Sequence, residues 1–395
     1  MADYVPFINN DGDYNRFLKH YSDAKAVRVL LQRVNRQSVN TIARQSCLWV
    51  DAGMDGYDCL LTGKKMFDQW KRYIREFDPE MVLADVGFLQ SPTREKVKKV
   101  AFAALDKCNS LEPTWISVPF LPVTGDSSRN RINRELAFSA GQWQTHCGFR
   151  GDLVLPLVFT HADQLKGRTQ WKKTVDLTKR CYDDSGASII WVAESELYDQ
   201  MCRAAFVSRF GSLIRFHEDL KEALPGSAKI IAGPYWGMNM VLWVRGLCDH
   251  PAVSLGAGYR YGISGAFAKR TTRFHIALAP LRRWAVASRE LKDWIDDALV
   301  RIDADDPVYP AFRLLERTVD TSMMSEEASK NQVARTYKEW YDKIQQASPS
   351  ARTLALYQDL SSAYVLGKQL PKLPKSEAPG REAGKVAEQL MLHCL

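Results

Sequence analysis

Three aspartates follow one short apolar run near the start of the sequence. The run CLWV is followed by Asp51, Asp55 and Asp58, with Gly53 and Gly56 between them. Glycines allow a tight loop in which the backbone can approach a ligand. Because they have no side chains, they also leave Asp51 accessible to that ligand. Carboxylates in this position suit chemistry at an anomeric carbon, where an oxocarbenium-like transition state needs nearby negative charge and a base to activate water.

A second apolar run, MVLADV (81–86), also carries an aspartate at its end, Asp85, followed only by Val86. If the two runs are neighbouring parallel strands, Asp51 and Asp85 converge on one pocket and each raises the pKa of the other. We therefore predict that Asp51 and Asp85 are the catalytic carboxylates. The alternative is that each aspartate caps a helix or fixes a loop.

Polar and aromatic residues at the ends of later runs are predicted to bind the substrate. Aromatic rings could sandwich a base that has left its stack, while polar side chains contact its edge. The predicted substrate-binding residues are Gly53, Asp55, His161, Asp163, Glu194, Tyr235, Trp236, Asn239, Tyr259 and Arg260. For the aromatic members, ordinary packing is the alternative.

The segment SSRNRINRE (127–135) is predicted to bind nucleic-acid phosphates. It carries Arg129, Arg131 and Arg134 in a polar stretch that we expect to be a loop behind a strand. Guanidinium groups on such a loop can hold a phosphate backbone without selecting a base sequence. The net charge of +8 agrees with an acidic partner, for which we expect DNA. A solvated surface loop is the alternative.

The sequence lacks the motifs that are typical of several classes of protein. The eight cysteines form no CxxC pair and no Cys/His cluster at zinc-site spacing, so neither a metal nor a cofactor is expected. There is no GxxxxGK[ST], HExxH or GxSxG motif. No run of 18 apolar residues and no secretory leader is found, so we expect a cytoplasmic protein without membrane contact.

Short apolar runs that alternate with helical segments must position these residues. Strands are predicted at 47–52, 81–86, 114–120, 152–160, 187–194, 228–233 and 252–258, with 274–280 as a candidate eighth. Seven or eight such units favour a (β/α)8 barrel, the TIM-barrel fold, whose reactive face is built at the carboxyl-terminal ends of the strands. A doubly wound open sheet is the competing architecture.

Three regions are predicted along the chain. The barrel domain, with an N-terminal helical segment, covers residues 1–285, and a helical appendage covers 286–370. Residues 371–395 begin with a linker rich in Pro, Lys and Glu and end in a short helix.

The order of these pieces resembles the tRNA-guanine transglycosylases and their DNA-acting relatives of the DpdA type. VDAGMDGY is similar to the family's DSGGFQ segment, which places Asp51 where the family keeps an aspartate at the reacting nucleotide. LADVGFLQSPTREK resembles the family's later aspartate loop, which places Asp85 where the family reads the base. ASIIWVAESEL and IIAGPYWGMNMVLWVRGLCDHPAVSLGAGYRYG resemble its later strands, so the similarity covers roughly residues 45–265.

Two departures change what the resemblance implies. The family's zinc site is absent, and the late strand that should present a nucleophilic aspartate reads AVSLGAGYRYG, with Asp249 just upstream as a shifted substitute. Without a covalent nucleophile, attack by water is more economical than base exchange. We therefore expect a DNA glycosylase that removes a modified base, such as a hypermodified viral base, and leaves an abasic site. Antiviral defence would be a fitting role.

Three other functions remain open from the sequence. A DNA- or tRNA-guanine transglycosylase would exchange a base for a deazaguanine through a covalent intermediate. A barrel enzyme could instead act on a small sugar or nucleoside, with the arginine segment as plain surface. The third alternative is a nucleic-acid-binding protein with an inactive site.

Overall fold

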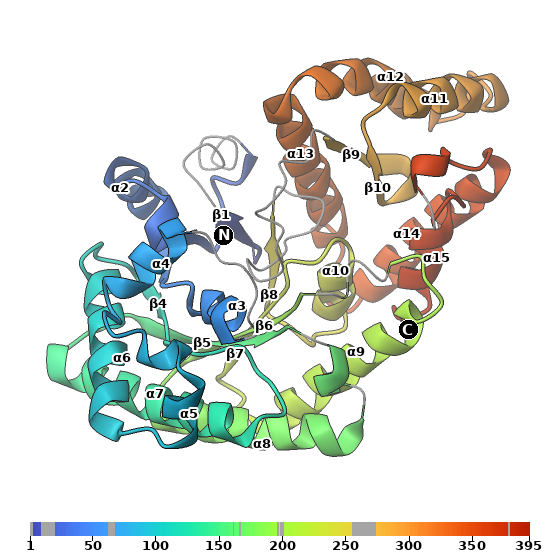
Figure 1. Cartoon of the computed structure of the whole chain (residues 1–395). Coiled ribbons are helices and arrows are strands. Elements are labelled where there is room, and N and C mark those ends of the chain that lie inside the picture. The colour runs from blue at the N-terminus through green and yellow to red at the C-terminus, as the bar shows by residue number, and fades with distance from the viewer. Residues whose placement is uncertain are drawn as a thin grey trace.

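The computed structural model describes residues 3–8, 20–61, 68–160, 162–165, 167–195, 197, 201–254, 274–377 and 380–395. Within these residues, eight parallel strands close into a barrel in sequence order (Figure 1). The strands are β1 (Val5–Ile8), β2 (Ala26–Leu30), β3 (Cys47–Asp51), β4 (Trp115–Ser117), β5 (Asp152–Phe159), β6 (Ile189–Glu194), β7 (Lys229–Ala232) and β8 (His250–Val253). The predicted (β/α)8 barrel is confirmed.

Helices cover the outside of this barrel. They are α2 (Arg36–Gln45), α3 (Tyr57–Leu61), α4 (Asp68–Arg75), α5 (Val86–Gln90), α6 (Arg94–Asn109), α7 (Ser127–Cys147), α8 (Arg168–Ser185), α9 (Phe206–Ala223) and α10 (Met238–Val244). Because helices enclose it, a strand such as β5 is apolar on both faces, as its sequence LVLPLVF shows. Short 3-10 helices lie in the connections: η1 (Leu31–Arg33), η2 (Met54–Gly56), η3 (Val82–Ala84) and η4 (Ala162–Leu165).

The strand predicted at 81–86 is wrong. This segment contains η3 and the first residue of α5. Asp78 causes the difference, because its side-chain oxygens accept hydrogen bonds from the backbone N–H groups of Val82 at 2.9 Å and Leu83 at 3.1 Å. These bonds hold the backbone in a helical turn.

The candidate eighth strand lies outside the barrel. Within 274–280, β9 (His275–Leu278) pairs antiparallel with β10 (Arg283–Val286) in a separate hairpin. The barrel is completed instead by β1 and β2, which were not predicted. Strand β1 closes it by pairing with β2 on one side and β8 on the other.

The C-terminal helices are divided between two hydrophobic cores. They are α11 (Arg289–Arg301), α12 (Tyr309–Met324), α13 (Glu326–Gln345), α14 (Arg352–Gln369) and α15 (Lys385–Met391). Buried residues of α13, α14 and α15 belong to the same core as the barrel strands. Helices α11 and α12 pack with the β9–β10 hairpin in a second core. No helix among the described residues is long and apolar enough to cross a membrane.

Candidate active site

Arg28 is a fully buried cation in the interior of the barrel. It lies on β2, opposite Phe7 of β1 and Trp49 of β3 in the strand register. The guanidinium carbon is 4.7 Å from the centre of the Phe7 ring and 4.6 Å from that of the Trp191 ring. These ring faces attract the cation and offset part of the free energy needed to remove it from water.

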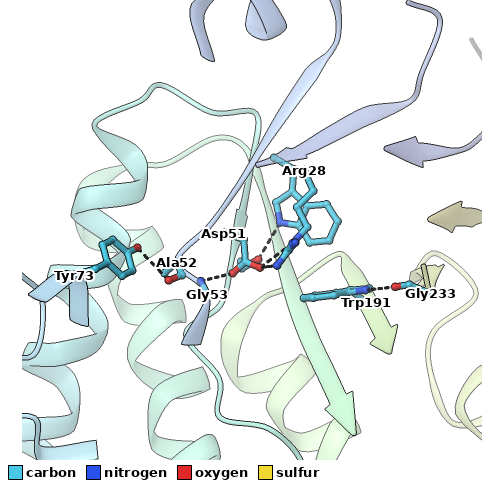
Figure 2. Close-up of polar contacts among 9 residues, drawn as sticks. Arg28, Asp51, Ala52, Gly53, Tyr73, Trp191 and Gly233 are labelled. Atoms are coloured by element: carbon cyan, nitrogen blue, oxygen red, sulfur yellow. Dashed lines mark hydrogen bonds and ion pairs between the residues drawn. The ribbon is translucent and has the colours of Figure 1, made fainter. Parts of the chain in front are cut away.

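Asp51, the last residue of β3, supplies the opposite charge (Figure 2). Arg28 donates from Nε to Asp51 Oδ2 at 2.8 Å, and its Nη2 contacts the same oxygen. Asp51 lies two residues beyond Trp49, so both side chains point from β3 to the same side. A buried cation requires a paired anion, which explains why this buried strand ends in a carboxylate.

The other Asp51 oxygen holds the loop that carries Asp55. The N–H of Gly53 donates to Asp51 Oδ1 at 2.9 Å (Figure 2). Gly53 has φ 67°, in the left-handed region that favours glycine, and η2 begins directly after it. Tyr73 adds a second restraint, because its hydroxyl donates to the carbonyl oxygen of Ala52 at 3.0 Å. Asp55 is thus held close to the ion pair by a restrained turn.

Asp55, which follows Gly53 in this loop, has a raised pKa. Its side chain is half-buried. Burial raises the pKa of Asp55 to about 6, the negative charge of Asp51 adds to the rise, and the positive charge of Arg28 opposes it. A carboxyl with a pKa near neutral can accept and donate a proton under physiological conditions. Asp51 and Asp55 therefore differ in environment, since Asp51 is held in an ion pair with Arg28 and the pKa of Asp55 is raised.

Asp58, the third aspartate after β3, lies in α3 and is buried in a second ion pair. Arg129 donates from Nη1 to Asp58 Oδ1 at 2.8 Å, which links α3 to α7. The prediction of a loop at 127–135 is wrong, because these residues begin α7. Asp126 caps that helix by accepting from the N–H of Ser128. Arg129 is 7% exposed and already paired, so the expected phosphate contact at this residue is not supported.

The other two predicted phosphate ligands lie on the surface of α7. Arg131 is exposed and donates to the carbonyl oxygens of Leu89 and Gln90 at the end of α5. Arg134 is also exposed.

Asp85 does not lie at the end of a barrel strand. It is exposed and is the N-cap of α5, where its Oδ1 accepts from the N–H of Gly87 at 2.8 Å. The expected convergence of Asp51 and Asp85 from neighbouring strands is therefore wrong. For Asp85, the structure has the alternative arrangement, in which the carboxylate caps a helix.

Trp236 and Asn239 lie in the contact between the barrel and α13. The Trp236 ring packs edge-on against Tyr337 of α13, with centres 5.3 Å apart, and against Trp284 of β10, with centres 4.9 Å apart. Asn239 is fully buried, and its Oδ1 accepts from the Tyr337 hydroxyl at 2.7 Å. Its Nδ2 donates to the carbonyl oxygen of Ala252. These side chains are used in packing, so the prediction that they bind a substrate is not supported.

Glu194 and Tyr235 are also engaged within the protein. Glu194 ends β6 and forms an ion pair with Arg209 of α9, with 3.3 Å between Oε1 and Nη2. Its backbone N–H donates to the Tyr235 hydroxyl oxygen at 2.7 Å. Burial raises the pKa of Tyr235 well above its ordinary value. This cluster joins β6 to the start of the connection after β7.

Asp249, the candidate shifted nucleophile, lies at the wrong end of the barrel. It directly precedes β8 and accepts from the N–H of Ile230 at 2.9 Å, near the start of β7. Lys229 lies 3.2 Å from its other oxygen. This is the amino-terminal edge of the strands, whereas Asp51 lies at the carboxyl-terminal edge.

Some predicted residues fall outside the described part of the chain. They are His161, Tyr259 and Arg260, together with the side chain of Asp163 in η4. Among the described residues, no three His, Cys, Asp or Glu side chains are grouped so that they could hold a metal ion.

Comparisons with known proteins add only distant likenesses. No protein-family model and no curated protein sequence matches the chain. N-(5'-phosphoribosyl)anthranilate isomerase from Pyrococcus furiosus is 11% identical over 66% of this chain and 92% of its own, with a TM-score of 0.33. The carboxyl transferase domain of Rhizobium etli pyruvate carboxylase, in its structure with pyruvate, is 12% identical, with a TM-score of 0.36. The chain spans 61% of that domain's length. Neither likeness is strong enough to transfer an activity.

Proposed function

We propose that the chain is an enzyme that hydrolyses the N-glycosidic bond of a modified base in DNA, with Asp55 as its acid–base group. The observation that carries the proposal is the pair of unequal carboxylates at the carboxyl-terminal edge of β3. One is ion-paired with Arg28, and the other has a pKa raised to about 6. Glycoside hydrolysis uses such pairs, in which environment assigns different roles to two carboxyl groups.

In the proposed reaction, ionised Asp55 accepts a proton from a water molecule as the water oxygen bonds to the anomeric carbon. The bond from that carbon to the base nitrogen breaks, and its electron pair leaves with the base. Asp51 is a positioning residue, because its two oxygens are held by Arg28 and by the N–H of Gly53. Hydrolysis is favoured over base exchange because Asp249 lies at the opposite edge of the barrel.

The proposal is tested by incubating the protein with DNA that carries natural and modified bases. Mass spectrometry would then detect released bases and abasic sites. We expect release by the wild type and by Asp85→Asn, and none by Asp55→Asn. Free modified nucleosides are assayed as a second substrate. Base release from these nucleosides and not from DNA would identify an enzyme that acts on small molecules. Full release by Asp55→Asn, or release from no substrate, would contradict the proposal.

A further inference from the structure

Three neighbouring helices carry nearly all of the net charge of the chain. Helices α6, α7 and α8 hold thirteen lysines and arginines and six aspartates and glutamates. Their net charge of +7 compares with +8 for the entire sequence. The helices are consecutive around the barrel, with α7 packed between α6 and α8 (Figure 1).

Within these helices, the basic residues concentrate at the amino-terminal ends. The first eight residues of the three helices (94–101, 127–134 and 168–175) contain ten lysines and arginines and a single acid, Glu95. The helix dipole favours negative charge at this end and disfavours positive charge. Folding of the helices therefore does not account for this arrangement, whereas an anionic partner does.

Nine of these ten cations are exposed to solvent. Only Arg129 is buried, in its ion pair with Asp58. Arg94 and Lys96 pair with carboxylates at the surface. Five further cations are exposed and form no ion pair within the described part of the chain: Lys99, Arg134, Arg168, Lys172 and Lys173. Three of these, together with Thr169 and Asp176, line a surface hollow of about 400 Å³ on α8.

The basic ends face the same side of the barrel as Asp51 and Asp55. Helices α7 and α8 begin shortly after the carboxyl ends of β4 and β5, and α6 ends shortly before β4 begins. All three helices therefore start at the carboxyl-terminal edge of the strands, where the candidate active site lies. Neighbouring packed helices are about 8–10 Å apart, so the three ends span roughly 20 Å. That distance corresponds to about six phosphates along one strand of DNA.

We infer that the amino-terminal ends of α6, α7 and α8 form a docking surface for the phosphate backbone of a nucleic acid. The inference rests on the proposed function, because it adds the surface that brings a DNA substrate to Asp55. A nucleic acid fits better than an anionic membrane, since no large hydrophobic side chain is exposed in 94–101, 127–134 or 168–175. Contacts of lysine and arginine with phosphate give affinity without base specificity.

The test measures binding of the full chain to labelled single- and double-stranded oligonucleotides by fluorescence anisotropy at several salt concentrations. The variant Arg134→Gln/Lys172→Gln/Lys173→Gln removes three charges from the surface. We expect duplex affinity to fall at least tenfold at low salt, and the slope of log affinity against log salt to fall by about 3. The matched control, Lys368→Gln/Lys372→Gln/Lys375→Gln, removes three exposed charges from the C-terminal region and should bind as the wild type does.

Binding that is absent in the wild type, or that falls equally in both triple variants, would overturn the inference. So would binding to phosphatidylcholine vesicles containing phosphatidylglycerol without binding to oligonucleotides. Circular dichroism checks that each variant is folded. Because these measurements need no turnover, salt-sensitive binding without base release would contradict the proposed function alone.

Discussion

Arg28 and Asp51 form an ion pair inside the barrel, with 2.8 Å between Nε and Oδ2. Arg28 is fully buried and Asp51 is 4% exposed, so water cannot replace either partner. The pair fixes the end of β3, and the bond from Gly53 to Asp51 extends this restraint to the turn that carries Asp55. Removing one partner should therefore disturb both stability and the site.

Arg28→Met should lower the free energy of unfolding by about 3–5 kcal/mol, because it leaves the Asp51 carboxylate buried without a counter-charge. The double variant Arg28→Met/Asp51→Asn should be more stable than Arg28→Met alone. Urea unfolding of the wild type, both single variants and the double variant measures the coupling. Additive losses would show that the two side chains do not stabilise one another.

The rate of base release should depend on the ionisation of Asp55. Because the base must be ionised, and burial raises the pKa of Asp55 to about 6, kcat/KM should fall about tenfold per pH unit below that value and level off above it. Release assays at a series of pH values measure this profile. A flat profile between about pH 5 and 7 would exclude Asp55 as the base.

Asp55→Asn should stabilise the protein at neutral pH. The pKa of Asp55 is raised from 3.8 to about 6 in the folded protein, so its ionised form is disfavoured there. The resulting loss of stability begins as pH rises above 3.8 and is complete above about 6. Urea unfolding should therefore show Asp55→Asn to be more stable than the wild type at neutral pH, with a difference that shrinks towards pH 4. A difference independent of pH would argue against the raised pKa.

Substitution of Asp85 should affect the stability of α5 and leave catalysis unchanged. Asparagine also serves as an N-cap, so Asp85→Asn should retain both stability and base release, whereas Asp85→Ala should lose about 1 kcal/mol of unfolding free energy. Thermal unfolding and the release assay test the two statements separately. If folded Asp85→Asn fails to release the base, Asp85 takes part in catalysis and this prediction is wrong.

His217 should make the protein sensitive to acid. It is fully buried, with Nδ1 3.2 Å from the carbonyl oxygen of Leu247, and burial lowers its pKa to about 4. The unfolded chain binds this proton near pH 6.5, so the free energy of unfolding should fall by roughly 3 kcal/mol as pH drops from about 6.5 to 4. His217→Gln should lack this part of the pH dependence in urea unfolding. The same slope in both proteins would assign the acid sensitivity to other groups.

The barrel could be predicted because most of its strands are uninterrupted apolar runs. The run DLVLPLVF, for example, predicts β5 from its composition alone. Strand β2 was missed because Arg28 interrupts AVRVL, and an arginine there becomes acceptable only beside Asp51 and aromatic rings from β1 and β6. A lone arginine in a β-branched run was the available signal. Strand β1 was missed because VPFI is only four residues long.

The candidate site could be predicted only where its parts are close in sequence. Asp51, Gly53 and Asp55 lie in one loop, so their association was visible. The role of Asn239 depends on Tyr337, 98 residues away, and a local sequence pattern gives no sign of that partner. Asp85 was misplaced because a carboxylate after an apolar run fits a strand end and a helix cap equally well. Only the bonds made by Asp78 decide between them.

The contact of α10 with the C-terminal helices affects how the chain folds during translation. A Cβ atom on Gly237, just before α10, would lie 2.6 Å from Leu390 of α15 and 3.2 Å from Trp340 of α13, so these elements meet at close range. Residues made more than a hundred positions later thus cover part of the barrel wall. As the polypeptide leaves the ribosome, this apolar flank stays bare until α15 has emerged, and a nascent barrel would need shielding from other chains in that interval.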